Sequence, residues 1–67
     1  MTVGERIVYL RWLNGLTQSE LAAAGLSRQC LYEYESDKAD PKLFNAMCIA
    51  DVLGVSLDYL ARGETKK

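Results

Sequence analysis

The stretch from Gln18 to Glu35, with the sequence QSELAAAGLSRQCLYEYE, constrains the fold more than any other part of the chain. Its first half places Leu21 and Ala22 on one face of a short helix, and its second half places Leu31 and Tyr34 on one face of another. Two crossed helices need this spacing in order to share a core. The stretch therefore predicts two short helices joined by a tight turn.

Capping signals delimit these two helices. Thr17 followed three residues later by Glu20 is a capping-box pattern, and the Ser27 hydroxyl can accept hydrogen bonds from the free amides of the helix that follows. We expect the first helix to run to about Ala24, a glycine to turn the chain, and the second helix to cover residues 28–35. This arrangement is a helix-turn-helix.

Capping signals and apolar spacing predict three further helices and no strand. They cover residues 3–13, 41–53 and 57–62, and the middle one is expected to have Asp40 as its cap and Pro41 in its first position. The side chains expected to face the core from these helices are Val3, Ile7, Leu10, Leu13, Leu43, Ala46, Met47, Ile49, Ala50, Leu53, Leu57 and Leu60. The fold class is therefore all-α, a compact bundle of five helices.

The composition fits one small domain, and we expect it to cover residues 1–63, followed by a short polar tail at 64–67. There is no histidine, and Cys30 and Cys48 form no CxxC pair, so no metal site is expected. Without histidine, a nucleophile elbow or a phosphate-binding glycine loop, an enzyme is also not expected. Nothing resembles a signal peptide or a membrane span, which favours a cytoplasmic protein with reduced thiols. No cofactor is expected.

The chain resembles the lambda-repressor-like, or XRE, helix-turn-helix family of phage repressors, Cro-like proteins and small bacterial regulators. The resemblance covers nearly the whole chain and rests on GERIVYLRWLNGLTQSELA, GLSRQCLYEYE and LFNAMCIADVLGVSLDYL. It implies a five-helix lambda-repressor-like domain and a sequence-specific transcriptional regulator that binds double-stranded operator DNA.

The resemblance also implies roles for individual residues. Gln18 corresponds to a contact with the sugar-phosphate backbone, and Arg28 and Gln29 correspond to residues that reach base edges, where arginine suits guanine and glutamine suits adenine. Tyr32 and Glu33 lie one turn further along the same helix and can also reach the groove of the DNA. For these two residues, as for Arg28 and Gln29, the alternative is ordinary solvent-exposed surface without DNA contact. The expected DNA-binding set is Gln18, Ser27, Arg28, Gln29, Tyr32, Glu33, Lys38 and Lys42.

Two further assignments follow from the resemblance. Arg11 and Glu35 match positions that form an ion pair in some relatives. Such a pair would fix the angle between the helices expected at residues 3–13 and 28–35. Lys38 and Lys42, together with the backbone amides at the start of the helix expected at residues 41–53, are expected to contact DNA phosphates.

Three positions depart from the family pattern. The segment between Ala22 and Gly25 is one residue shorter than in the family, which calls for a tighter turn. The orientation of the helix expected at residues 28–35 is therefore left open. Asp37 stands where a glycine is common, and aspartate tolerates the left-handed conformation. Trp12 stands where a charged residue is usual, and either partial burial or a protein contact would account for it.

The charge of the chain disfavours DNA binding by a monomer. Eight basic and nine acidic side chains give a net charge of −1, and the pI of about 5.2 is low for a nucleic-acid module. We therefore expect a homodimer that reads two half-sites, with contacts around Val55, Leu57, Tyr59 and Leu60, although Leu57 and Leu60 can equally belong to the core.

No effector domain is expected in this length, and hence no small-molecule effector. The protein's own concentration would then set its activity, as in Cro-like repressors, restriction-modification controllers or antitoxin-type autorepressors, and the sequence leaves these three open. The alternative function is a protein-interaction module that uses the same fold and binds a partner through its acidic surface and Trp12.

Overall fold

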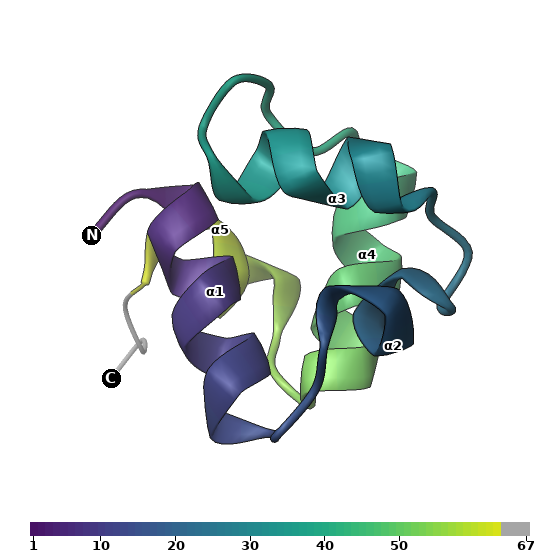
Figure 1. The fold of residues 1–67 in the computed structure, drawn as a ribbon. Helices are drawn as coiled ribbons and strands as arrows, with labels where there is room; N and C mark the ends of the chain where they lie inside the picture. The colour runs from purple at the N-terminus through teal and green to yellow at the C-terminus, as the bar shows by residue number, and fades with distance from the viewer. Residues whose placement is uncertain (64–67) are drawn as a thin grey trace.

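The structure is a computed structural model that describes residues 1–63. Over this range the chain forms five helices and no strand (Figure 1). They are α1 (Val3–Leu13), α2 (Gln18–Ala22), α3 (Arg28–Glu35), α4 (Leu43–Leu53) and α5 (Leu57–Arg62). The predicted all-α class is confirmed, while the predicted tail at 64–67 lies outside the described residues.

Local capping explains where four of the helices begin. Thr2 and Thr17 each form a complete capping box with the glutamate three residues later, and Ser27 and Ser56 each accept one amide hydrogen bond from the first turn of the helix that follows. Each bond satisfies an amide that the helix itself leaves without a partner. These four predicted helix starts are confirmed.

The predicted start of α4 is wrong. The helix begins at Leu43 rather than Pro41, and its N-cap is Lys42, whose backbone is extended and whose side chain makes no capping hydrogen bond. Asp40 therefore does not cap the helix. The connection from α3 turns at residues 36–39, where Asp37 is left-handed, and is still extended at Lys42, so the local Asp-Pro signal does not set the start of the helix.

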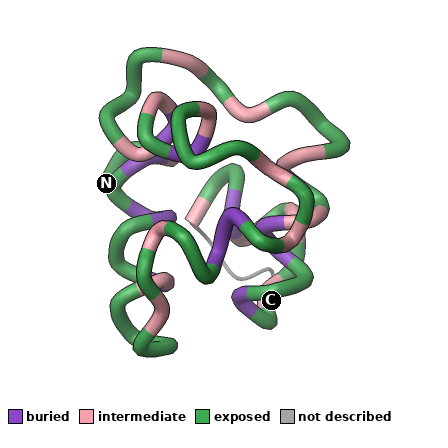
Figure 2. Tube along the Cα trace, turned by 45° about the vertical axis from the view of Figure 1, so that its right-hand side comes forward, coloured by how far each residue is buried: buried purple, intermediate pink, exposed green. Residues whose placement is uncertain are grey.

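The helices pack around a single core (Figure 2). In Figure 1, α3 crosses above α1 and α2, and the contacts of α5 with both α1 and α4 close the bundle. The buried apolar side chains are Ile7, Leu10, Leu21, Ala22, Leu31, Tyr34, Ala46, Ile49, Ala50, Leu53 and Leu60. The residues predicted to face the core from the helix-turn-helix, Leu21 and Ala22 from α2 and Leu31 and Tyr34 from α3, are thus part of the core.

Three residues predicted to face the core are exposed instead. Leu13 is 57% exposed, Leu43 is 67% exposed and Met47 is 47% exposed. Leu13 and Leu43 lie in the last turn of α1 and the first turn of α4, and Met47 lies at the edge of the buried face of α4. Periodicity identifies the face of a helix correctly, but it does not show how far along and around the helix the packing extends.

The turn between α2 and α3 accommodates the missing residue. Helix α2 ends at Ala22, two residues earlier than predicted, and the chain continues with hydrogen bonds from Ala24 to the Leu21 carbonyl and from Gly25 to the Ala22 carbonyl. These bonds span three residues rather than four, as in a tighter 3₁₀ turn. Gly25 has a φ of 129°, which other residues rarely adopt. The expected tighter turn is confirmed.

The loop after α3 holds the start of α1. Asp37 has a φ of 63°, and its carboxylate accepts hydrogen bonds from the Gly4 amide at 3.1 Å and the Thr2 hydroxyl at 2.7 Å. A Cβ atom at Gly4 would lie only 2.8 Å from the Glu35 carbonyl oxygen, so α1 approaches the end of α3 closely. This contact fixes the position of α3, which carries the candidate site.

Candidate nucleic-acid interface

Helix α3 separates into a buried face and an outward face. Leu31 and Tyr34 are buried, whereas Arg28, Gln29 and Tyr32 are exposed. Because residues four apart are neighbours on a helix, the outward face has two adjacent rows, Arg28 with Tyr32 and Gln29 with the half-buried Glu33. The third helix therefore presents the predicted polar residues together.

The first row borders a shallow hollow of about 350 Å³ lined by Gln18, Arg28, Gln29 and Tyr32. Gln18 is the first residue of α2, so this hollow joins the two helices of the helix-turn-helix. The Lys38 ammonium nitrogen lies 5.6 Å from the centre of the Tyr32 ring, at the range of a cation–π contact. The loop after α3 thus places a cation beside this row.

The second row contains a hydrogen bond between its own members. Gln29 Nε2 donates to Glu33 Oε2 at 3.1 Å. Both side chains therefore have a defined mutual orientation on the outward face of α3.

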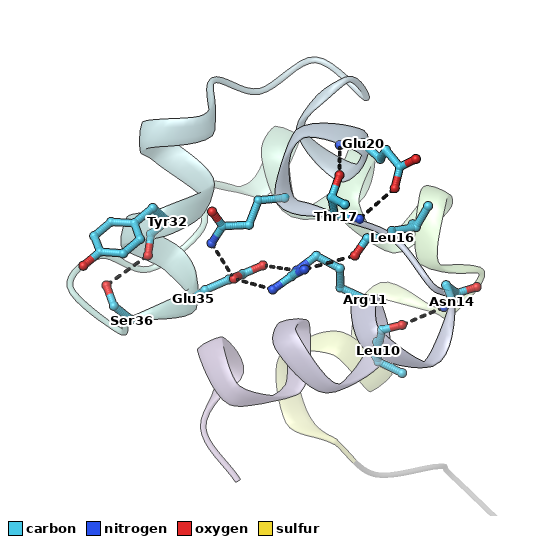
Figure 3. Close-up of polar contacts among 10 residues, drawn as sticks. Leu10, Arg11, Asn14, Leu16, Thr17, Glu20, Tyr32, Glu35 and Ser36 are labelled. Atoms are coloured by element: carbon cyan, nitrogen blue, oxygen red, sulfur yellow. Dashed lines mark hydrogen bonds and ion pairs between the residues drawn. The ribbon is translucent and has the colours of Figure 1, made fainter.

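An ion pair fixes α3 to α1 (Figure 3). Arg11 Nε donates to Glu35 Oε2 at 2.8 Å, Arg11 Nη2 donates to Oε1 at 3.2 Å, and Arg11 Nη1 donates to the Leu16 carbonyl at 3.0 Å. Gln18 Nε2 also donates to Glu35 Oε1 at 2.8 Å. One carboxylate therefore connects the last turn of α3 with α1 and with the first residue of α2.

The remaining predicted residues lie outside the hollow. Ser27 is exposed, and its hydroxyl accepts from the Cys30 amide as the N-cap of α3. Lys42 is exposed at the start of α4. The structure therefore groups Gln18, Arg28 and Gln29 closely and places Ser27 and Lys42 at two neighbouring helix starts.

Behind the outward face, α3 is anchored to α4 by a contact that the sequence did not reveal. Asn45 Nδ2 donates to the Tyr34 hydroxyl at 2.8 Å, and the half-buried Cys30 sulfur lies 4.0 Å from the same nitrogen. Burial raises the pKa of Tyr34 above its usual value. An asparagine in the first turn of a helix carries no signal that it will meet a tyrosine from another helix.

Trp12 is not buried. It is 73% exposed and, with Glu5, Val8, Tyr9 and the end of α3, lines a second shallow hollow on the outer face of α1. The partial burial considered from the sequence is therefore wrong, and this aromatic face remains open.

Neither a metal centre nor a membrane anchor is found in the described part of the chain. Residues 1–63 contain no cluster of three or more histidine, cysteine, aspartate or glutamate side chains suited to a metal ion. No helix among them has both the length and the apolar character needed to cross a membrane.

Comparisons with known proteins agree with this geometry. A family model described as helix-turn-helix matches residues 7–60. The immunity repressor protein of Bacillus phage phi105 is 39% identical over 66 residues, which cover 97% of this chain and 46% of that repressor. The chain therefore spans about half the length of this relative.

Two solved structures have the same fold. The P22 c2 repressor, crystallised with a synthetic operator, superposes with a TM-score of 0.90 at 28% identity, covering 96% of this chain and 98% of that one. SinR, a master regulator for biofilm formation crystallised with DNA, superposes with a TM-score of 0.84 at 31% identity, covering 88% and 97%. The short turn before α3 is thus compatible with the fold of both proteins.

Proposed function

Since the chain belongs to the lambda-repressor-like helix-turn-helix family, we propose that it is a sequence-specific, DNA-binding transcriptional regulator that reads its operator with α3. The observation that carries the proposal is that Gln18, Arg28, Gln29 and Tyr32 line one shared hollow. The proposal assigns one DNA-binding domain to residues 1–63 and no catalytic step. Two free cysteines fit a reducing compartment, so we place the activity in the cytoplasm.

The proposed base readers are Arg28 and Gln29. An exposed guanidinium at the start of α3 can donate two hydrogen bonds to guanine O6 and N7, and the Gln29 amide can bond adenine N6 and N7. Tyr32, one turn further on, can touch a thymine methyl group or a phosphate. These contacts supply the sequence preference, because base edges differ from one pair to another in the major groove.

The proposed phosphate contacts flank the readers. Gln18 lies at the start of α2 and Ser27 at the start of α3, while Lys38 and Lys42 follow in the next connection. No side chain caps α4, so its first amides are available to a phosphate beside Lys42. Such contacts position the protein on the duplex without reading its sequence.

We propose a homodimer that binds two half-sites. The net charge of −1 gives a single domain little general attraction for DNA, so two linked half-sites about one helical turn apart, ~34 Å, are needed for a useful affinity. Of the predicted dimer contacts, Leu60 is buried in the core, which leaves the half-buried Val55, Leu57 and Tyr59.

Selection from a random duplex library at moderate salt, with light scattering, tests this function. We expect a pseudo-palindrome bound by a dimer. Arg28→Ala and Gln29→Ala should each relax the preference at one or two positions and cost about 1–3 kcal/mol on the operator. Arg62→Ala, which removes an exposed arginine from α5, is the matched control for the lost charge.

Two results would count against the proposal. Equal losses on operator and random DNA would show that Arg28 and Gln29 do not read bases. A library without any enriched sequence, even at low salt, would remove the DNA-binding function itself.

The exposed aromatic face of α1 favours a second function, binding of a partner protein. Exposed aromatic side chains concentrate at protein interfaces, and Trp12 and Tyr9 lie side by side in one hollow. Trp12 is also the only tryptophan, so its fluorescence reports on this face alone. A partner captured by the wild type but lost with Trp12→Ala, while Arg28→Ala still captures it, would support this function.

A further inference from the structure

We infer that Glu33 determines specificity in two ways: it orients the Gln29 amide for base reading, and it rejects DNA that offers no amino group opposite it. The inference rests on the proposed function and concerns the second row of α3, Gln29 with Glu33. The observation behind it is the hydrogen bond from Gln29 Nε2 to Glu33 Oε2 at 3.1 Å.

The bond sets the orientation of the Gln29 amide. An ionised carboxylate can only accept hydrogen bonds, so Glu33 favours the amide rotamer that turns Nε2 toward it and disfavours the flipped one, in which two acceptor oxygens would meet. With one N–H used, Gln29 retains one donor and its carbonyl acceptor. Adenine needs this pair of groups, because it presents the N7 acceptor and the N6 amino donor side by side.

The charge of Glu33 adds a second constraint. Of the two carboxylates in α3, Glu35 is buried in its contacts with Arg11 and Gln18, whereas Glu33 is half-buried on the outward face. Within residues 1–63, Glu33 makes no ion pair that would neutralise it. It therefore brings an acceptor-only negative charge to the groove.

Such a charge discriminates among base edges. Phosphate oxygens, guanine O6 and N7, and thymine O4 are all acceptors and would be repelled, whereas the amino groups of cytosine and adenine can donate to Glu33. A site without an amino group there would leave the acceptor positions of Glu33 that Gln29 does not fill desolvated and without a donor, which is costly. Glu33 thus gains specificity by penalising wrong sequences, at the expense of affinity for DNA in general.

Two substitutions separate the two roles. Glu33→Gln removes the charge but keeps an oxygen that can accept from Gln29, while Glu33→Ala removes both. Asp51→Asn is the control, since it neutralises an exposed carboxylate on α4 that makes no side-chain hydrogen bond within residues 1–63. The dissociation constants are measured on the selected operator, on its single-base variants and on random duplex, with thermal melts to verify folding.

Glu33→Gln should bind random duplex several-fold more tightly and lose about tenfold or more of its discrimination at one base pair, while the preference at the Gln29 position is kept. Glu33→Ala should lose the same discrimination and should also weaken the preference at the Gln29 position. Combined with Gln29→Ala, Glu33→Ala should then cause no further loss at the Gln29 position, because the two residues act as one unit.

The outcomes distinguish this inference from the proposed function. If the wild type selects an operator but Glu33→Gln behaves like Asp51→Asn on every duplex, the inference is overturned and the proposed function stands. If the wild type selects no operator, both are overturned.

Discussion

Replacing Glu35 by alanine should strongly destabilise the protein. The carboxylate accepts three hydrogen bonds, two from Arg11 and one from Gln18, and its side chain is only 6% exposed. Its removal would leave the Arg11 guanidinium with the Leu16 carbonyl as its one hydrogen-bond partner and the Gln18 amide with none among the described residues.

The expected cost is about 2–4 kcal/mol. Hydrogen bonds to charged groups contribute about 1.5–3 kcal/mol, and breaking a fully buried ion pair costs about 3–5 kcal/mol. The Arg11 side chain is 19% exposed, so water can partly solvate it and the lower part of this range applies. A 67-residue domain has a free energy of unfolding of only about 3–10 kcal/mol, and the Tm should therefore fall by about 10–30 °C.

Urea and thermal unfolding followed by circular dichroism measure this effect. The Arg11→Ala single variant and the Arg11→Ala/Glu35→Ala double variant complete a cycle in which the double loss should be smaller than the sum of the single losses. Asp51→Ala, an exposed carboxylate on α4, is the control and should change stability by less than about 0.5 kcal/mol. A Glu35→Ala variant as stable as this control would refute the reasoning.

Two further predictions concern packing and pH. Gly4→Ala should lower the free energy of unfolding by about 1–3 kcal/mol, although alanine favours helices, because its Cβ would meet the Glu35 carbonyl oxygen at 2.8 Å; a higher urea midpoint would contradict this close contact. Burial raises the pKa of Tyr34, so the fold favours its neutral form, and the resulting stability is present below about pH 10 and lost as pH rises through the raised pKa. Tyr34→Phe loses the Asn45 hydrogen bond and should therefore be less stable at neutral pH. Its free energy of unfolding, measured by urea titration, should decline less steeply with pH above about pH 10 than that of the wild type. An unchanged dependence on pH would exclude Tyr34 as the cause.

The sequence predicted the features that depend on neighbouring residues. Thr2, Thr17, Ser27 and Ser56 each cap the helix that follows, as expected, because a capping hydrogen bond spans only two or three residues. The same locality explains why the residues of α3 that point away from the core could be predicted. Residues four apart on a helix are neighbours whatever the rest of the fold does.

Features that depend on distant parts of the chain could not be predicted in this way. Arg6 is buried because its guanidinium donates to the carbonyls of Leu60 and Met1, and only the folded bundle brings the end of α5 to this side chain. Asn45 meets Tyr34 for a similar reason. The late start of α4 likewise follows from the path of the connection rather than from its Asp-Pro pair.

Gln18 shows how stability and recognition are connected in this small domain. Its amide nitrogen donates to Glu35 in the ion-pair network, and its side chain lines the hollow beside Arg28. The Glu35 carboxylate, held by Arg11, therefore fixes the side chain proposed to contact the DNA backbone. A residue of the stabilising network thus also forms part of the proposed interface, and the network holds its side chain in place for recognition.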